Sequence, residues 1–372
     1  MQSNDDLPHI EPQPDLSQYF EESNEPQALE KTQIRKSVLM FLVTFCSVFL
    51  VYGFQWTSGN PLTEPEIAWE SIQFAAGLMG ILLCHEMGHY VVAKKHGFAL
   101  SVPYFLPFPF AFGTLGAVIQ LKSFPKDRNG LLEMGAAGPI AGFIATFLCL
   151  VMDLGNTKNA PQLSIDIPKA EVEAVLVEAS IQELETIDIW LQNIGLLSEV
   201  SVDHFTVMIM SDPLLFRAMH HLMFDEPLSK FAQLGPFAFA AWVGCMITSI
   251  NLLPIGQLDG GHVVNALLPK HAHLISKTML VCAILMGIFT WKGWLVWAIL
   301  LYFMGATQSI PVPKQTILST RAKTIALITM IVFLLCVMKE PIYSLSVPLD
   351  EINWVENSGE MESMKKDLLE ME

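Results

Sequence analysis

The feature that most constrains this chain is a series of long stretches that carry almost no charge. A membrane-spanning helix needs about 20 mostly apolar residues, or somewhat fewer where it is tilted or the bilayer is thin. Seven windows meet or approach this requirement: residues 37–52, 67–93, 131–154, 236–253, 274–291, 294–304 and 324–338. The sequence therefore predicts an all-α polytopic membrane protein with about seven transmembrane helices and the lipid bilayer as its surroundings.

The charge and the cysteines exclude two classes of protein. Only 16% of the residues are charged, whereas a soluble protein carries about a quarter. The net charge is −16, and the acidic residues crowd both tails. No nucleic-acid partner is expected, because nucleic-acid binding needs a basic face. The six cysteines are scattered through apolar segments without paired spacing, which argues against a secreted disulfide scaffold.

Lysine and arginine predict the orientation, because positive residues gather on the cytoplasmic side of a membrane. Lys31, Arg35 and Lys36 precede the first window, whereas residues 57–66, after it, contain neither Lys nor Arg. Seven spans place the later basic residues on the cytoplasmic side as well: Lys94, Lys95, Lys122, Lys126, Arg128, Lys270, Lys277, Lys314, Arg321 and Lys323. The C-terminus is then expected outside.

The same pattern divides the chain into five segments. We expect an acidic disordered cytoplasmic tail (1–36), a first group of spans (37–153), an extracytoplasmic insertion (154–234), a second group of spans (235–340) and an acidic C-terminal tail (341–372). Within the insertion, residues 171–185 alternate acidic and apolar positions at helical spacing and predict an amphipathic helix. Residues 205–224 are interpreted as a surface or interfacial helix rather than an eighth span.

The N-terminal tail also bears on localisation. It is too acidic for an organelle transit peptide and has no apolar core of a signal peptide. We therefore predict a multi-pass protein of the cell membrane, the bacterial inner membrane in particular.

The second window contains a candidate metal-binding motif. Residues 85–89 read H-E-M-G-H and match the H-E-x-x-H pattern. Four residues make about 1.1 turns of helix, so His85 and His89 share a face and can hold one metal ion. Glu86 is positioned to take a proton from water. Ionisable groups in a membrane helix cost about 3 kcal/mol each on insertion scales, so three together indicate a function. His96 follows two lysines and is interpreted as a solvated residue at the helix end.

A catalytic zinc site usually has three protein ligands, so a third is needed. The best candidate is Asp259, where the fourth window reaches the cytoplasmic side in N-L-L-P-I-G-Q-L-D-G-G-H. An ordinary Asp-Gly turn is the alternative, and spacing alone does not decide between them. His262 competes as a ligand, but its place after two glycines favours a polar turn residue. The helix is expected to break at Pro254, Gly256, Gly260 and Gly261.

The stretch between the second and third windows is apolar but irregular. Residues 101–112 contain three prolines and cannot form a regular helix, while residues 117–121 resemble a strand. A re-entrant β-hairpin beside the active site, with an edge that pairs with an unwound substrate, is one interpretation. An aromatic loop at the membrane interface is the other. In the third window, the spacing of Gly135, Gly138 and Gly142 indicates close helix packing beside the site.

These two motifs resemble those of the site-2 protease family of intramembrane zinc metalloproteases. Its hallmarks are H-E-x-x-H in one transmembrane helix and N-x-x-P-x-x-x-x-D-G in a later one, and both are present in that order. The resemblance extends from residue 77 to residue 269 and is closest to the plant chloroplast and bacterial branch.

The resemblance implies a role for each matching residue. His85, His89 and Asp259 are expected to bind Zn²⁺, with Glu86 as the catalytic acid/base. Asn251 is expected near the substrate or the oxyanion, and Gly116 on the hairpin is the second candidate for substrate binding. The implied activity is that of a zinc metalloendopeptidase that cuts peptide bonds in or near the transmembrane helices of membrane proteins.

Two other functions compete with this prediction. Intramembrane His and Asp also mark ion pathways, so a metal transporter is one alternative. A transporter is expected to carry polar ligands on several spans at different depths, and the other windows are nearly bare of them. A catalytically inactive relative that acts as a membrane chaperone is the second alternative. The joint presence of His85, Glu86, His89 and Asp259 argues against it.

Overall fold

The computed structural model describes residues 31–57, 59–98, 100–119, 127–157, 164–165, 204–225, 228, 234–303, 317–348 and 353–354. The predicted disorder of the first 30 residues, the helix expected at 171–185 and most of the C-terminal tail lie outside these residues. The described part is mainly helical, with three small two-stranded sheets.

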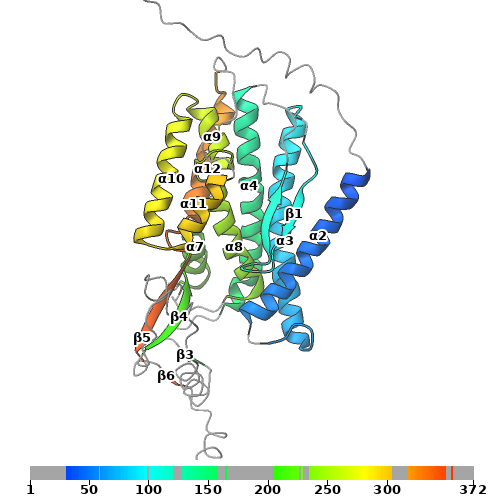
Figure 1. Ribbon diagram of the computed structural model, residues 1–372, viewed down its shortest axis with the longest axis vertical. Helices are drawn as coiled ribbons and strands as arrows, with labels where there is room; N and C mark the ends of the chain where they lie inside the picture. Colours follow the sequence, from blue (N-terminus) through cyan, green and yellow to red (C-terminus); the bar gives the residue numbers. More distant parts are fainter. Residues whose placement is uncertain are drawn as a thin grey trace, which may run out of the picture.

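Helices occupy all seven apolar windows, in a bundle whose long axis is vertical in Figure 1. In chain order these are α2 (Lys31–Val51, extended by a π-helical turn, Tyr52–Trp56), α3 (Pro65–Lys95), α4 (Arg128–Asp153), α8 (Pro236–Asn251), α10 (Ala272–Phe289), α11 (Gly293–Phe303) and α12 (Thr320–Cys336). Two further helices, α7 (Leu214–Phe224) and α9 (Asp259–Leu267), are short.

Four helical segments of the described chain are long and apolar enough to cross a membrane: Lys31–Trp56, Pro65–Lys95, Arg128–Asn156 and Ala272–Phe289. The other three windows form shorter helices of 16, 11 and 17 residues. The protein is therefore a membrane protein by composition and length of its helices, and the count of seven spans stays a prediction.

Local sequence explains where the central helices begin. The Asp127 carboxylate accepts a hydrogen bond from the Gly130 amide (2.7 Å) and so caps α4, and Ser319 does the same for α12 through Ala322 (3.1 Å). Such caps satisfy amides that have no partner within the helix. Pro65 opens α3, a position where its missing amide costs nothing.

The helices α3, α4 and α8 form the centre of the bundle, and α4 also packs against α9 and α12. Small residues allow close approach: a Cβ at Gly77 on α3 would lie 2.9 Å from the Ala240 side chain on α8. The buried Asp153 carboxylate joins α4 to the start of α8, accepting hydrogen bonds from Phe237 (2.8 Å) and Ala238 (3.1 Å).

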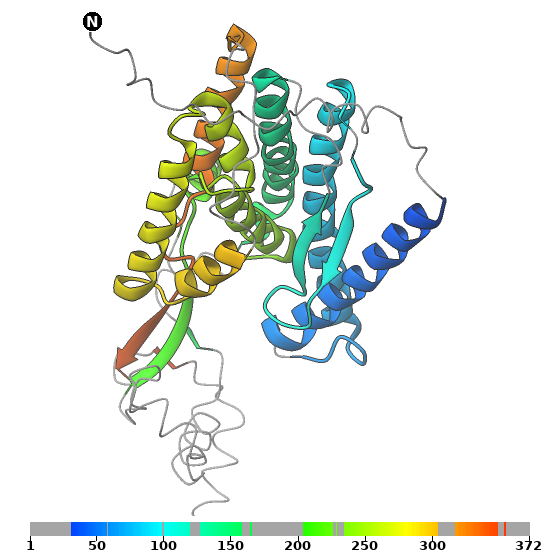
Figure 2. The ribbon, with the colours of Figure 1, turned by 45° about the horizontal axis from the view of Figure 1, so that its top comes forward.

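Between α3 and α4 the chain forms the antiparallel hairpin β1 (Tyr104–Pro107) and β2 (Thr114–Val118). The hairpin is thus present, and its re-entry into the membrane stays a prediction. Figure 2 shows it between the tilted α2 and the rest of the bundle. Ser47 and Trp56, from α2 and its extension, donate hydrogen bonds to the carbonyls of Phe108 (3.2 Å) and Ala111 (2.8 Å).

A second two-stranded sheet corrects one prediction. Residues 205–224 do not form one helix: β4 (His204–Met210) pairs with β5 (Ile342–Pro348), and only then does α7 begin. The first part is rich in β-branched residues, which favour strands, and its partner lies more than 130 residues further along the chain, where periodicity carries no information about it. Two further strands, β3 (Ser164–Ile165) and β6 (Asn353–Trp354), pair in parallel.

The link between β4 and α7 contains the half-buried Asp212. Burial raises the pKa of its carboxyl group to about 6, although Arg217 and His220 both act to lower the pKa. This carboxyl group lies outside the candidate spans.

Candidate metal centre

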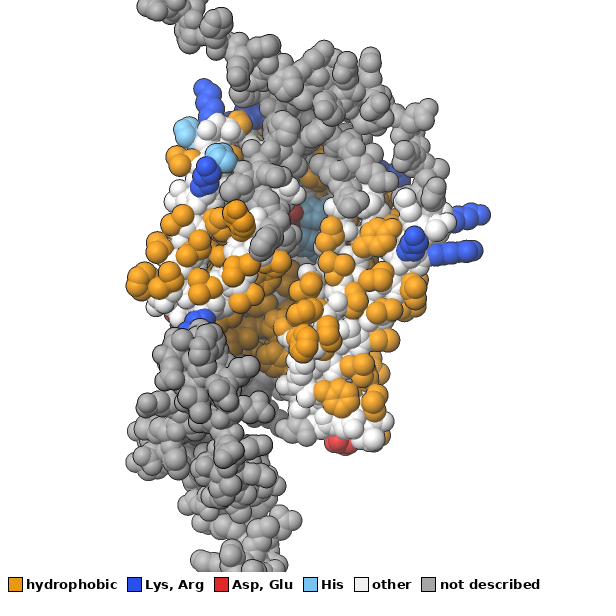
Figure 3. All heavy atoms as spheres, in the orientation of Figure 1, with side chains coloured by type: hydrophobic (Ala, Val, Ile, Leu, Met, Phe, Trp, Pro, Cys, Tyr) orange, Lys and Arg blue, Asp and Glu red, His pale blue; other side chains and the backbone are white. Residues whose placement is uncertain are grey.

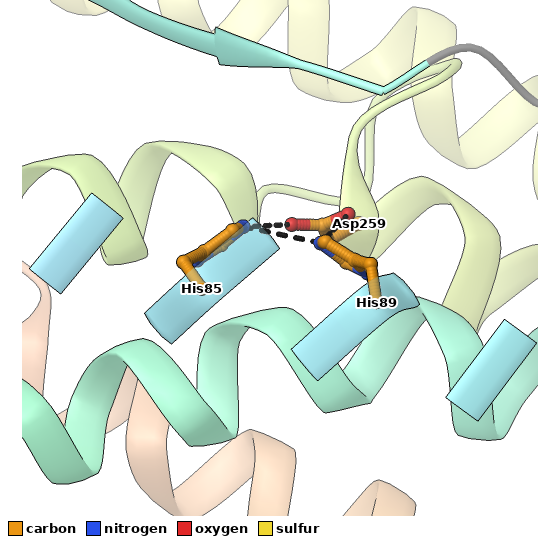
Figure 4. Close-up of side chains that lie close together, drawn as sticks. All are labelled: His85, His89 and Asp259. Carbon is orange, nitrogen blue, oxygen red and sulfur yellow. Dashed lines mark hydrogen bonds and ion pairs between the residues drawn. The ribbon is translucent and has the colours of Figure 1, made fainter. Parts of the chain in front are cut away.

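The two histidines of the H-E-x-x-H motif lie on one face of α3. Their Nε2 atoms are 3.1 Å apart, and a spacing of four residues on an α-helix allows this close approach. Figure 4 shows both rings pointing toward the Asp259 carboxylate. His85 is buried, and the His89 side chain is only 13% exposed.

Asp259 opens α9 and reaches both rings. Its Oδ2 lies 3.2 Å from His85 Nε2, and its Oδ1 lies 3.2 Å from His89 Nε2. The three residues come from two segments 170 positions apart in the chain, and their ligand atoms all lie within 4.8 Å of one another. Among the described residues, this is the one such group of His, Cys, Asp or Glu side chains.

The break between α8 and α9 differs from the expected one. It spans residues 252–258, with Gly256 in the left-handed region (φ 47°). Gly260 and Gly261 do not break the helix but lie in the first turn of α9. A Cβ at Gly260 would overlap the Leu252 carbonyl, and one at Gly261 would overlap the Gly256 carbonyl. Both glycines therefore let α9 pack directly on the loop that precedes it.

Backbone and glycines of α4 fix the two rings. His89 Nδ1 lies 2.8 Å from the Met134 carbonyl oxygen, to which it can only donate, so its Nε2 lone pair faces Asp259. A Cβ at Gly138 would overlap the His89 ring, and one at Gly142 would lie 3.1 Å from His85 Nδ1. The predicted glycine spacing thus has a more specific reason than helix packing, since these positions leave room for the imidazoles.

The donor set fits a catalytic metal ion. Two imidazole nitrogens and a carboxylate oxygen match the three protein ligands of a typical catalytic zinc site. The two Nε2 atoms face each other at 3.1 Å, so one cation can bind both when each ring offers its Nε2 lone pair. A carbonyl behind a ligating imidazole is also the usual outer partner at zinc sites.

The remaining predicted residues lie around this group to different extents. Glu86 is buried and interacts electrostatically with both histidines and Asp259. Asn251 Nδ2 lies 3.5 Å from His85 Nε2. Gly116 lies on β2, which contacts α3, and has positive φ (96°) with open space where a Cβ would stand.

Two other histidines fall outside the group. His262 lies within α9 rather than in a turn, and its Cβ packs against Gly135, where an added Cβ would be 2.9 Å away. His96 contacts the buried Glu133 carboxylate (3.1 Å), which also pairs with Arg321 on α12 (3.1 Å). This contact gives His96 a structural partner, whereas the sequence predicted a purely solvated residue.

The surface of the bundle gives access to this region. In Figure 3 a hollow opens between two apolar masses, and histidine and acidic side chains are visible at its base. Most of the basic side chains in this view lie toward the upper end of the molecule.

Comparison with known proteins identifies the family. The family model of peptidase family M50 matches residues 73–294, more than half of the chain, and includes both motifs. The chain belongs to peptidase family M50. The resemblance to the site-2 proteases is therefore confirmed for this M50 protein.

Its similar relatives include plant proteins. The chain is 29% identical over 202 residues to the probable zinc metalloprotease EGY1, chloroplastic, of Oryza sativa subsp. japonica, which covers 54% of this chain and 29% of the relative. The corresponding Arabidopsis thaliana EGY1 protein is 28% identical (54% and 30%), and the Arabidopsis EGY2 protein is 25% identical (63% and 35%). The chain thus spans about a third of the length of these relatives. No solved structure matches the chain.

Proposed function

We propose that this M50 protein is a zinc-dependent intramembrane endoprotease that hydrolyses peptide bonds in or near transmembrane helices. The observation that carries the proposal is the convergence of His85, His89 and Asp259 from α3 and α9, with the buried Glu86 beside them. The names of the plant relatives, which describe zinc metalloproteases, point to the same chemistry.

In this proposal His85, His89 and Asp259 hold Zn²⁺. The ion, when bound, polarises the scissile carbonyl and makes water a better nucleophile at neutral pH. Asp259 contributes a negative charge that offsets part of the charge of the cation in the low-dielectric interior. The Met134 carbonyl holds the His89 ring in the tautomer that ligation needs.

Glu86 acts as the general base and then as the general acid. It takes a proton from the attacking water and returns it to the nitrogen of the leaving peptide. Glu86 comes one position after His85 and is not among the three clustered ligand atoms, so its carboxylate is available for proton transfer. Asn251, close to His85, is proposed to donate its amide hydrogens to the substrate carbonyl.

The β1–β2 hairpin is proposed to bind the substrate as an added strand. A peptide bond in a helix is shielded by its own hydrogen bonds, so the substrate must unwind before it is cut. The edge of the hairpin offers backbone groups to an extended chain. The open space at Gly116 leaves room for the close approach of such a chain. A transmembrane protein is therefore the proposed substrate.

The proposed topology has seven spans and an active site that opens toward the cytoplasm. The five segments defined by the sequence keep their bounds: 1–36, 37–153, 154–234, 235–340 and 341–372. The pairing of β4 with β5 supports one part of this topology, because it joins the insertion to the segment after α12 on one side of the membrane. The bacterial inner membrane remains the proposed location, although the plant relatives are named chloroplastic.

Labelling tests this orientation. In cells, a membrane-impermeant thiol reagent should not reach a cysteine that replaces Lys95, and should reach one that replaces Leu62 in the loop before α3. The unsubstituted chain gives the background from its six native cysteines. Labelling of the Lys95→Cys variant from outside together with protection of Leu62→Cys would overturn the topology.

Activity requires a direct test, best made on the purified full chain in lipid nanodiscs. The protein should contain one zinc ion and cleave a model single-span substrate. Cleavage should stop on treatment with a chelator and return on addition of Zn²⁺. Stoichiometric zinc without cleavage of any of a panel of single-span substrates would favour a transporter or an inactive relative. Cleavage that persists without metal would contradict the proposal outright.

A further inference from the structure

The loop that precedes Asp259 is held by a side chain from another helix. Ser276, on α10, is buried, and its hydroxyl group makes two hydrogen bonds to this loop. It accepts one from the Gly256 amide (3.1 Å) and donates one to the Pro254 carbonyl (3.3 Å). Both groups belong to the non-helical stretch between α8 and α9, where backbone groups cannot bond as they do within a helix. Buried backbone groups need such partners.

The C-terminal end of α9, the short helix that begins at Asp259, is bonded by a side chain from α4. Arg128, in the first turn of α4, donates from Nε to the Ala266 carbonyl (2.7 Å) and from its terminal nitrogen to the Leu267 carbonyl (3.0 Å). These are the last carbonyls of α9, which lack acceptor partners within the helix and carry the negative end of its dipole. The planar guanidinium group suits two neighbouring acceptors, which an ammonium group does not match.

We infer that Ser276 and Arg128 are positioning residues that set where Asp259 stands relative to His85 and His89. The inference rests on the proposed function, since it concerns the zinc ligand set of that site. With nine residues, α9 is too short to be stable through its own hydrogen bonds. Its position therefore depends on its packing against α4 and on what holds its two ends.

Ser276 and Arg128 both affect the distance between the Asp259 carboxylate and the two histidine rings. The histidines belong to α3 and are oriented through α4 by the Met134 carbonyl. Arg128 ties the end of α9 to that same α4, and Ser276 ties the loop that leads into α9 to α10. Loss of either anchor lets α9 shift relative to the histidines while the histidines keep their own support. The outcome is weaker zinc binding and slower catalysis, with substrate binding unchanged.

The test uses the purified full chain and measures zinc affinity by competition with a chelator, alongside kcat and KM. We expect Ser276→Ala and Arg128→Gln each to raise the zinc dissociation constant by about tenfold, as outer-shell changes at zinc sites do. Both should lower kcat and leave KM unchanged. Ser276→Thr keeps the hydroxyl group and should retain most of the zinc affinity.

Ser249→Ala provides the matched control. Ser249 is as buried as Ser276 (both 6% exposed), but its hydroxyl group donates to Met246 within its own helix. This variant should bind zinc as the unsubstituted protein does. All measurements are made below the thermal midpoint of each metal-free variant, so that unfolding does not contribute to the result.

The possible results are distinct. Zinc affinity and kcat that stay unchanged in both Ser276→Ala and Arg128→Gln would overturn the inference, as would an equal loss in Ser249→Ala. If the unsubstituted protein binds zinc but cleaves nothing, the proposed protease function fails while the zinc measurements still decide the inference. If the unsubstituted protein does not bind zinc, both fail.

Discussion

A methyl group added at Gly138 should disable the site although no ligand residue is replaced. Gly138 lies on α4 against the His89 imidazole, and a Cβ there would overlap the ring, with its Cε1 at 2.5 Å. Ordinary contact begins at 3.4 Å, so the His89 ring in the Gly138→Ala variant must retreat by about 1 Å to clear Cε1, and by more to clear the nearer Nε2, before van der Waals contact is favourable. The ring cannot retreat freely, because Nδ1 bonds the Met134 carbonyl.

The size of the effect follows from this displacement. Misplacement of a catalytic group by about 1 Å can cost 100-fold in rate, and disturbance of an outer partner lowers metal affinity by about 10- to 100-fold. We therefore expect Gly138→Ala to lower kcat about 100-fold and zinc affinity at least tenfold. Overpacking should also destabilise the fold by about 1–3 kcal/mol.

Two alanine variants give a graded series for this prediction. At Gly142 a Cβ would lie 3.1 Å from His85 Nδ1, which requires a shift of only a few tenths of an ångström, so a loss of a few-fold is expected. At Gly80, on α3, it would meet nothing within 4 Å, so activity should be unchanged. Zinc content and initial cleavage rates of the purified variants check the order. Wild-type zinc and activity in Gly138→Ala, or equal losses in all three, would refute the reasoning.

Further substitutions test the third ligand and the half-buried Asp212 between β4 and α7. Asp259→Asn should lower zinc occupancy and cleavage together, and Asp259→Ala should do so more severely. His262→Ala should spare zinc, and the opposite pattern in metal analysis would make His262 the third ligand. Asp212→Asn should raise the thermal midpoint at pH 8 but not near pH 4, with the difference growing between about pH 4 and pH 6 and levelling off above pH 6. A raised pKa means that the buried carboxyl stabilises the fold below about pH 4 and loses this contribution as it ionises. Since this carboxyl is half-buried, the gain at pH 8 is about 1 kcal/mol after screening, and a pH-independent difference in midpoint would contradict it.

Much of the fold could be predicted from the sequence, because a chain that crosses a bilayer must do so in apolar helices of about 20 residues. Every apolar window became a helix, and the prolines of residues 101–112 excluded a helix where the β1–β2 hairpin forms. The histidine pair was also accessible, since a spacing of four residues fixes its geometry within one helix. Asp259 was accessible only through the motif and the resemblance, because no local rule brings α9 to α3.

The rest depended on contacts between segments far apart in the chain. A glycine is needed at position 138 because the ring of His89, 49 positions earlier, occupies the space of a Cβ. The roles of Ser276 and Arg128 appear only once the position of α9 is known. The apolar stretch 205–224 was likewise interpreted as a surface or interfacial helix, because β5, the partner of β4, follows only after α12. Such pairings could be found only from co-variation between positions or from a structure.

Glu86→Gln tests the central claim most directly, because Glu86 transfers a proton in this account and binds no metal. Purified Glu86→Gln and unsubstituted protein are compared for zinc content by elemental analysis and for cleavage of the same single-span substrate. We expect equal zinc in both, an unchanged thermal midpoint and no cleavage by the variant. Full cleavage by Glu86→Gln would contradict the protease mechanism, and loss of zinc from it would show that Glu86 belongs to the ligand set instead.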